Sequence, residues 1–388
     1  MNSSEVHYAF LVIDTHADTP QRFLDEGWDF AAPLGTGMLS LDAAKAGGLD
    51  AEFFAIWVEP KYSGEYASRA FELMEAVREQ AHRHRERMRL CRTPKEILTA
   101  RAEGRFAALM GIEGGHAIEN SLDNLREFYK LGARYMTLTW SNSNEWADSS
   151  GDLDDPTVQH HNGLSKFGRE VVREMNRLGM MVDISHVSDK TFLDVMETTA
   201  APVIASHSSC RALTNAPRNL TDDMLRAIAK NNGVVMVNFY SGFLSDAWRK
   251  ARYAQEPERA AAYAELNARC VAEKRLPFFH EELAIDRRFA ALIPPVPLDA
   301  LIDHFDHIAQ VAGIDHVGIG TDFDGISAMP AGLHSAADLP KVTAALMARG
   351  YTPEQMQKLL GGNLMRVLND VQDLAAKWRA KEAATSPR

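Results

Sequence analysis

The sequence predicts an α/β protein built as a distorted (β/α)8 barrel of the TIM type, with a helical insertion after the seventh strand. Apolar runs of strand length recur along the whole chain, segments of helical periodicity separate them, and several runs end in His, Asp or Glu. Such alternation predicts parallel strands joined by right-handed crossovers. In a barrel the carboxyl ends of those strands meet at one mouth. We expect one domain over residues 1–388, a length that α/β barrels often reach.

Eight apolar runs are predicted to form the barrel strands. The first begins at Phe10 and leads into His16-Ala17-Asp18, so that His16 and Asp18, two positions apart, project to the same side. Continuous apolar runs of this length are typical of strands buried on both faces. The other seven runs are 51–58, 106–114, 135–140, 180–187, 202–208, 233–240 and 316–325.

Helical segments are predicted between these runs. Over 66–90, for example, apolar residues recur at the spacing of one helix face, opposite a dense face of Arg, Glu and His. Thr221 followed by two Asp residues is typical of a capped helix start, with carboxylates at the positive end of the helix dipole. The other helical segments are 122–131, 165–178, 192–196, 298–312, 336–349 and 352–368.

Residues 241–297 break this rhythm. The segment is rich in Ala, Arg and Glu and closes with Pro294-Pro295-Val296-Pro297, so we predict a helical insertion. Because long connections are usually functional, we expect it to cover the barrel mouth or to pack against a second subunit in a homodimer. The tail over 377–388 is expected to be frayed.

Composition narrows the class of function. A net charge of -11 argues against nucleic acids and anionic membranes as partners, and small molecules are better candidates. The three cysteines lack the C-x-x-C spacing of a thiolate metal site. The sequence contains neither a run of about 18 apolar residues nor the pattern of a secretory signal. As written, the chain is expected to be cytoplasmic, or periplasmic if a signal peptide was removed.

The predicted strand ends carry a set of metal-ligand residues. Burying three His and three carboxylates together would be costly unless they bind cations or each other. This set suits two divalent metal ions with Glu113 as a bridge, and two such ions activate water for attack on a carbonyl. A plainer alternative is that His16 only hydrogen-bonds Asp18 at a capped strand end. The residues are His16, Asp18, Glu113, His186, His207 and Asp322.

Five motifs together resemble those of the membrane (renal) dipeptidase family, peptidase family M19, of the amidohydrolase superfamily. The resemblance runs in order from about Val12 to Leu368. The motifs are His16-Ala-Asp18, Gly111-Ile-Glu113-Gly-Gly-His116, Asp183-Ile-Ser-His186, Ser206-His207-Ser-Ser and Gly320-Thr-Asp322-Phe-Asp-Gly.

The resemblance implies two zinc ions per chain, bridged by Glu113. It assigns His16 and Asp18 to one zinc, and His186 and His207 to the other. It also implies that Asp322 is the acid/base that receives a proton from a metal-bridging hydroxide and passes it to the leaving amine. Arg218, in Pro217-Arg218-Asn219, is implied to bind the C-terminal carboxylate of the substrate, a role that suits guanidinium geometry.

One position departs from the family pattern. Where the family usually has a His after strand four that polarises the scissile carbonyl, this chain has Trp140. An indole N–H donates one hydrogen bond but carries no positive charge. Either Trp140 donates in its place, or His160 or His161 moves in, or the preferred substrate is not a standard dipeptide.

Four nearby residues are given supporting roles. His116 is expected to hydrogen-bond a metal ligand. Asp183 and Asp324 are expected to be structural, and Arg211 is either a surface residue or a competing clamp for the substrate carboxylate.

Three hypotheses for function follow. The first is a zinc-dependent dipeptidase that also accepts, by the same resemblance, dipeptides with a C-terminal D-residue. The second keeps the barrel and the metals but hydrolyses another small amide, an N-acyl amino acid or a lactone, because of Trp140. The third is a metal-stabilised protein without useful catalysis that binds a peptide or partner through 241–297.

Overall fold

The computed structural model describes residues 1–385, and its centre is a closed parallel β-barrel. Neighbouring strands pair in the order β2-β1-β9-β8-β7-β6-β5-β4, and pairing of β2 with β4 closes the ring of eight. The predicted fold class is confirmed. The ring strands are β1 (Ile13–Ala17), β2 (Ala51–Trp57), β4 (Phe106–Glu113), β5 (Ala133–Thr137), β6 (Met181–Asp183), β7 (Val203–Ala205), β8 (Val234–Val237) and β9 (Val317–Ile319).

Each predicted run overlaps one barrel strand, but β5 begins two residues before its run and several strands are shorter than the runs. Strands β6, β7 and β9 have three residues each. His186, His207 and Asp322 therefore lie in the loops that follow these strands instead of on the strands themselves. Because these residues lie beyond the short strands, strand pairing does not fix their backbone, and the loop conformation orients each side chain.

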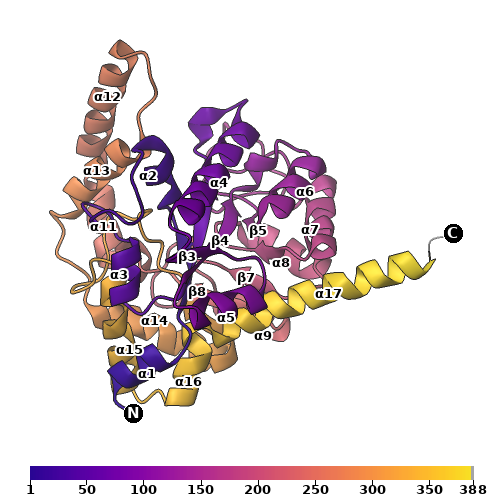
Figure 1. The fold of residues 1–388 in the computed structure, drawn as a ribbon. Helices are drawn as coiled ribbons and strands as arrows, with labels where there is room; N and C mark the ends of the chain where they lie inside the picture. Colours follow the sequence, from indigo (N-terminus) through magenta and orange to yellow (C-terminus); the bar gives the residue numbers. More distant parts are fainter. Residues whose placement is uncertain (386–388) are drawn as a thin grey trace.

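Helices surround the barrel between successive strands, as Figure 1 shows. Serine or threonine side chains cap several of them, including α6, α7, α8 and α9, by accepting a hydrogen bond from a backbone N–H in the first turn. The helices are α2 (Pro20–Asp25), α3 (Leu41–Ala46), α4 (Tyr66–Arg83), α6 (Leu122–Leu131), α7 (Lys166–Leu178), α8 (Asp189–Thr198), α9 (Asp222–Lys230), α14 (Leu298–Val311), α15 (Leu339–Ala348) and α16 (Pro353–Gln357).

Several short elements were not predicted. They include α1 (Ser3–Ala9), α2, α5 (Pro94–Ala102) and β3 (Met88–Leu90), which pairs with β4 outside the closed ring. The helix predicted over 66–90 ends at Arg83, because β3 occupies its last residues. A three-residue strand is too short to interrupt a helical pattern visibly.

The last helix, α17 (Asn363–Thr385), packs against the barrel with its first half. Its Leu364, Val367 and Val371 belong to the cluster that fills the barrel interior, together with Ile13 and Phe53 from the strands. The helix then extends beyond the barrel in Figure 1. Fraying from Lys377 was expected, but α17 continues to Thr385, and the remainder of that tail lies outside the described residues.

The insertion after β8 is helical, as predicted. It comprises α10 (Ser241–Leu244), α11 (Asp246–Ala254), α12 (Glu256–Ala272) and α13 (Phe279–Ala290). Helix α12 projects away from the barrel in Figure 1, and α13 lies beside α2. Lys61, which follows β2, donates hydrogen bonds to Glu282 (2.8 Å) and to the Pro277 carbonyl oxygen (2.7 Å). These contacts hold α13 close to the mouth of the barrel.

Within residues 1–385, no helix is both long enough and apolar enough to cross a membrane.

Candidate active site

A cavity of about 350 Å³ opens at the carboxyl ends of the barrel strands. Seven of the predicted site residues line it, contributed by six different strands and the loops that follow them; His16 is fully buried just beneath. The lining residues from the predicted set are Asp18, Glu113, Trp140, His186, His207, Arg218 and Asp322. The barrel therefore gathers side chains that are up to about three hundred residues apart in the sequence.

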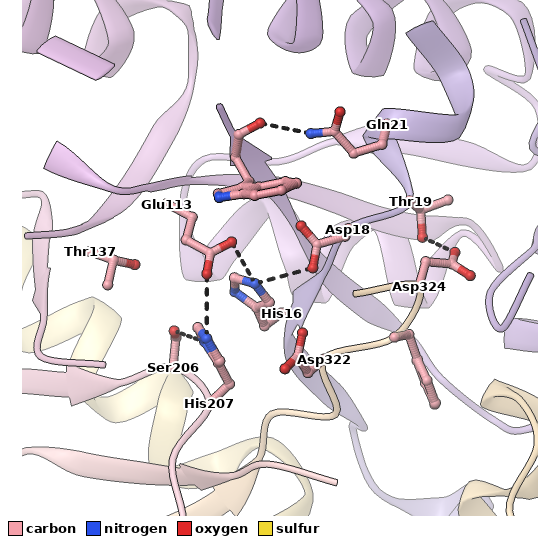
Figure 2. A network of polar contacts seen from close by, with 12 residues as sticks. His16, Asp18, Thr19, Gln21, Glu113, Thr137, Ser206, His207, Asp322 and Asp324 are labelled. Atoms are coloured by element: carbon pink, nitrogen blue, oxygen red, sulfur yellow. Dashed lines mark hydrogen bonds and ion pairs between the residues drawn. The ribbon is translucent and has the colours of Figure 1, made fainter. Parts of the chain in front are cut away.

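Glu113 lies between the imidazoles of His16 and His207 in Figure 2, and the His186 imidazole, from the loop after β6, lies against the same carboxylate. Its Oε2 is 3.2 Å from His16 Nε2. Its Oε1 is 2.9 Å from His186 Nε2 and 3.5 Å from His207 Nε2. On the other side, Asp18 Oδ2 is 3.7 Å from His16 Nε2. The two oxygens of Glu113 thus face two separate groups of side chains, which is the arrangement of a carboxylate that can bridge two metal ions.

The His16 ring is fixed by Tyr135. The Tyr135 hydroxyl donates its single proton to the Thr15 carbonyl oxygen (3.0 Å), so it accepts from His16 Nδ1–H (2.9 Å). Neutral His16 must then carry its proton on Nδ1 and turn the free lone pair of Nε2 towards Glu113 and Asp18. This is the tautomer that a metal ligand requires.

Asp183 fixes the His207 ring through Ser206. The Ser206 hydroxyl donates to Asp183 Oδ2 (2.6 Å) and therefore accepts from His207 Nδ1–H (2.7 Å). The lone pair of His207 Nε2 is left facing the cavity. Asp183, expected to be structural, acts here through Ser206 to orient a predicted ligand. For His186, by contrast, Nδ1 has no hydrogen-bond partner among residues 1–385.

The imidazole nitrogens and carboxylate oxygens at the cavity are better suited to binding a cation than to hydrogen-bonding one another. His186 Nε2 lies 3.0 Å from His207 Nε2, whose lone pair faces the cavity. His16 Nε2 and Asp18 Oδ1 are buried without a hydrogen bond from any described residue. Imidazole nitrogens and carboxylate oxygens are suitable ligands for zinc and related ions. The residues present therefore fit a metal centre.

Burial changes the protonation of these groups. It lowers the pKa of His186 to about 3, and the charge of Arg218 adds to this effect. Burial also lowers the pKa of His207 well below its usual value, so both rings are neutral, as ligands must be. Burial and the Glu113 carboxylate raise the pKa of Asp18 to about 8. Burial alone would raise the pKa of Glu113, but His16 and His186 lower it below its ordinary value.

Asp322 lies on the same cavity with one oxygen anchored. Asn238 Nδ2 donates to Asp322 Oδ2 (2.9 Å), and burial raises the pKa of Asp322. The backbone of Asp322 is left-handed (φ 65°), as is that of His186 (φ 68°). Non-glycine residues rarely adopt this conformation, and it is concentrated at functional sites. The carboxyl group is thereby held at the cavity, where it binds a proton more readily than a solvent-exposed aspartate does.

Arg218 lines the cavity from the loop after β7. It donates to Ser208 Oγ (3.0 Å) and to the His207 carbonyl oxygen (3.1 Å). Burial lowers its pKa to about 10, so the guanidinium stays charged at neutral pH. Arg211, the competing candidate, instead pairs through two nitrogens with Asp189 at 2.7 Å each, away from the cavity.

Comparison with known proteins agrees with this geometry. A family model described as membrane dipeptidase, peptidase family M19, matches residues 1–382. The chain belongs to the membrane dipeptidase family. Human Dipeptidase 3 is 32% identical over 385 residues, which is 96% of this chain and 67% of that protein. Members of this family are metallopeptidases, and the chain is accordingly a hydrolase of the dipeptidase type.

Two solved structures related to this membrane dipeptidase family member are similar over almost their whole length. The probable dipeptidase PvdM from Pseudomonas aeruginosa has a TM-score of 0.82 at 26% identity, covering 96% of this chain and 98% of that one. A metallopeptidase from Rhodobacter sphaeroides, liganded with a phosphinate mimic of the dipeptide L-Ala-D-Ala, has a TM-score of 0.74 at 27% identity. The match covers 93% of this chain and 99% of that one.

Trp140, the departure from the family pattern, lines the cavity. Its ring centroid is 4.8 Å from that of Trp57 and 6.3 Å from that of His186. In the described structure neither His160 nor His161 lines this cavity; the backbone N–H of His161 and the ring of His160 lie near Asp148 (2.8 and 3.8 Å). The Trp140 ring thus lines the cavity beside His186.

His116 and Asp324 both hydrogen-bond groups outside the predicted metal ligands. His116 was expected to hydrogen-bond a metal ligand, but its Nε2 bonds the Val58 carbonyl oxygen (2.7 Å), which places it in a structural role. Asp324 accepts hydrogen bonds from the Thr19 hydroxyl (2.7 Å) and the Met38 N–H (2.6 Å), so it is structural as expected.

Several cavity residues were not singled out from the sequence. Tyr135, Ser206 and Asn238 orient other groups; Tyr135 lies in the middle of β5, and Ser206 and Asn238 directly follow β7 and β8. Phe279 and Leu283 reach the cavity from α13 of the insertion, and no local pattern indicates which insertion residues face the barrel.

Proposed function

We propose that the protein is a zinc-dependent dipeptidase with two zinc ions per chain. His16 and Asp18 would hold one ion, His186 and His207 the other, and Glu113 would bridge them. The observation that carries this proposal is the position of Glu113, whose two oxygens face His16 on one side and His186 with His207 on the other. Family membership supports a metal-dependent peptidase.

The chain's own residues supply the remaining chemistry. When bound, a metal pair lowers the pKa of a water molecule and polarises a carbonyl group. Asp322, with its raised pKa and one oxygen held by Asn238, can accept the proton of the attacking water and return it to the departing amine. Arg218 can bind the substrate carboxylate and so place the amide bond above Glu113.

The substrate class follows from the size and charge of the site. A cavity of about 350 Å³ with one partly buried guanidinium suits a short substrate with a free C-terminal carboxylate. The Rhodobacter sphaeroides relative was solved with a mimic of L-Ala-D-Ala. We therefore include dipeptides with a C-terminal D-residue among the proposed substrates.

Hydrolysis of L,L- and L,D-dipeptides by zinc-reconstituted protein tests the proposal. We expect zinc-dependent turnover and about two zinc ions per chain, with both lost in a chelated sample. His186→Ala should lose turnover and one ion, whereas His82→Ala, a matched control on the exposed face of α4, should lose neither. Two bound ions without hydrolysis of any dipeptide would contradict the proposed activity while leaving the metal centre intact.

A second candidate function rests on Trp140. Because an indole cannot carry charge, it stabilises an oxyanion less than a protonated His would, and loss of such a donor typically costs about a hundredfold or more in rate. Hydrolysis of an N-acyl amino acid or another small amide fits the same metals and the same Arg218. Parallel assays of dipeptides and their N-acetyl forms distinguish the two functions.

A further inference from the structure

The order of strands in the barrel gives the cavity two ends. Between β2 and β7 the ring has three strands in either direction, namely β4, β5 and β6 on one side and β1, β9 and β8 on the other. Trp57 ends β2 and Arg218 lies in the loop after β7, and both line the cavity. Trp57 and Arg218 therefore face each other across the mouth, with Glu113 and the imidazoles between them.

The end of the cavity around Trp57 is built from large apolar side chains. The Trp57 ring centroid is 4.8 Å from that of Trp140 and 5.1 Å from that of Phe279, and Leu283 lines the cavity beside them. We refer to Trp57, Trp140, Phe279 and Leu283 as the aromatic wall. Trp57 is only 5% exposed. The wall is thus packed before any substrate enters.

Helix α13 supplies half of this wall from one face. Phe279, Leu283 and Asp286 are spaced i, i+4 and i+7, so they lie on the same side of the helix, and all three line the cavity. Asp286 is paired with Arg252 of α11, and Glu282 with Lys61. These ion pairs hold α13 from both sides, which makes its cavity face a fixed surface.

The opposite end of the cavity differs in character. Arg218, Phe243 and Ser141 also line a neighbouring pocket with several Asp residues, so the cavity is continuous with polar surroundings there. The two ends therefore offer a substrate a cation on one side and an apolar surface on the other.

We propose that the aromatic wall is the subsite for the amino-terminal residue of the substrate, and that it selects bulky apolar or aromatic side chains there. The inference rests on the proposed function, in which Arg218 binds the C-terminal carboxylate. With the carboxylate at the β7 side and the amide above Glu113, the amino-terminal residue extends towards β2. Trp140 then serves as a specificity-determining residue in place of the catalytic imidazole expected in the family.

The test compares two dipeptide series with the zinc-loaded full chain. In Gly-Ala, Ala-Ala, Leu-Ala and Phe-Ala only the amino-terminal side chain changes, and in Ala-Gly, Ala-Leu and Ala-Phe only the other one does. We expect kcat/KM to rise at least about tenfold from Gly-Ala to Leu-Ala or Phe-Ala, because each buried methylene adds roughly tenfold or more in a fitted apolar pocket. The second series should vary much less.

Variants of α13 attribute the preference to the wall. In Phe279→Ala and Leu283→Ala the ratio of kcat/KM for Phe-Ala over Gly-Ala should fall towards one. The conservative Phe279→Leu should restore most of it, which guards against misfolding as the cause. Leu292→Ala removes a leucine of the insertion that is 72% exposed, and should keep the wild-type ratio.

Two results would overturn the inference in distinguishable ways. Dipeptide hydrolysis with a flat first series, or with the preference confined to the second series, would refute the subsite and leave the proposed function standing. No hydrolysis of any dipeptide by protein that binds zinc would refute both.

Discussion

Replacing Asp183 by Asn should weaken metal binding, although Asp183 contacts no cavity atom directly. Asp183 Oδ1 accepts the N–H groups of Ser185 (3.0 Å) and Ser206 (2.8 Å), and Oδ2 accepts the hydroxyls of Ser206 and Thr137. Asparagine can keep the first pair of bonds through its oxygen. Its amide nitrogen, however, would present hydrogens to two hydroxyls that now donate, so the Ser206 hydroxyl must turn.

The turned hydroxyl reverses the tautomer of His207. Ser206 would then donate to His207 Nδ1, and the ring proton would move to Nε2, where it blocks the lone pair. Keeping the native tautomer instead leaves a buried donor unpaired, at a cost of about 1–3 kcal/mol. Loss of such an outer partner usually lowers metal affinity by about 10- to 100-fold, and we expect a loss within that range.

Competition with a chromophoric chelator measures this affinity for each variant. Thr137→Val is the matched control, because it removes the other hydroxyl from Asp183 Oδ2 without touching Ser206 or His207. It should bind zinc within about threefold of the wild type, a difference below 1 kcal/mol. Wild-type zinc affinity in Asp183→Asn, or an equal loss in Thr137→Val, would refute the reasoning.

Three further outcomes are expected. Asp322→Asn should lower kcat by roughly 10²- to 10⁴-fold while two zinc ions still bind; retained kcat would remove Asp322 from the mechanism. Arg218→Gln should lower kcat/KM at least about 30-fold, equivalent to about 2 kcal/mol, and Arg211→Gln should not; equal losses in steady-state assays would contradict the clamp. Burial lowers the pKa of His304 from 6.5 to about 4, so the unfolded chain takes up its proton first as the pH falls. Stability should therefore drop between about pH 6.5 and 4 by up to about 3 kcal/mol, and denaturant unfolding of the metal-free protein should show a smaller drop in His304→Asn.

The barrel and most of its mouth could be predicted from local sequence. Apolar runs and alternation place His16, Asp18 and Glu113 at strand ends because strand periodicity is a property of consecutive residues. His186 and His207 were expected on strands but lie past them, since strand lengths depend on pairing with neighbours. The hydrogen bond from His16 to Tyr135 joins residues 119 positions apart and leaves no local trace.

The insertion and the last helix show two different limits. Composition predicts that 241–297 is helical, but which face of α13 meets Trp57 depends on contacts such as the one between Lys61 and Glu282. For α17 the sequence does contain a pattern that indicates a continuing helix. Good helix formers such as Ala and Lys continue past Lys377, so the expectation of a frayed tail gave too little weight to intrinsic propensity.

The separation between α13 and the loops that carry the metal ligands has a consequence for how such an enzyme can diversify. Residues of α13 can be substituted without displacing His16 and Glu113, which lie on barrel strands, or Asp322, which lies in the loop after β9. New substrate preferences can therefore arise through substitutions in the insertion while the metal-binding and catalytic residues stay unchanged. The insertion after β8 is the part of the chain where relatives with different substrates should differ most.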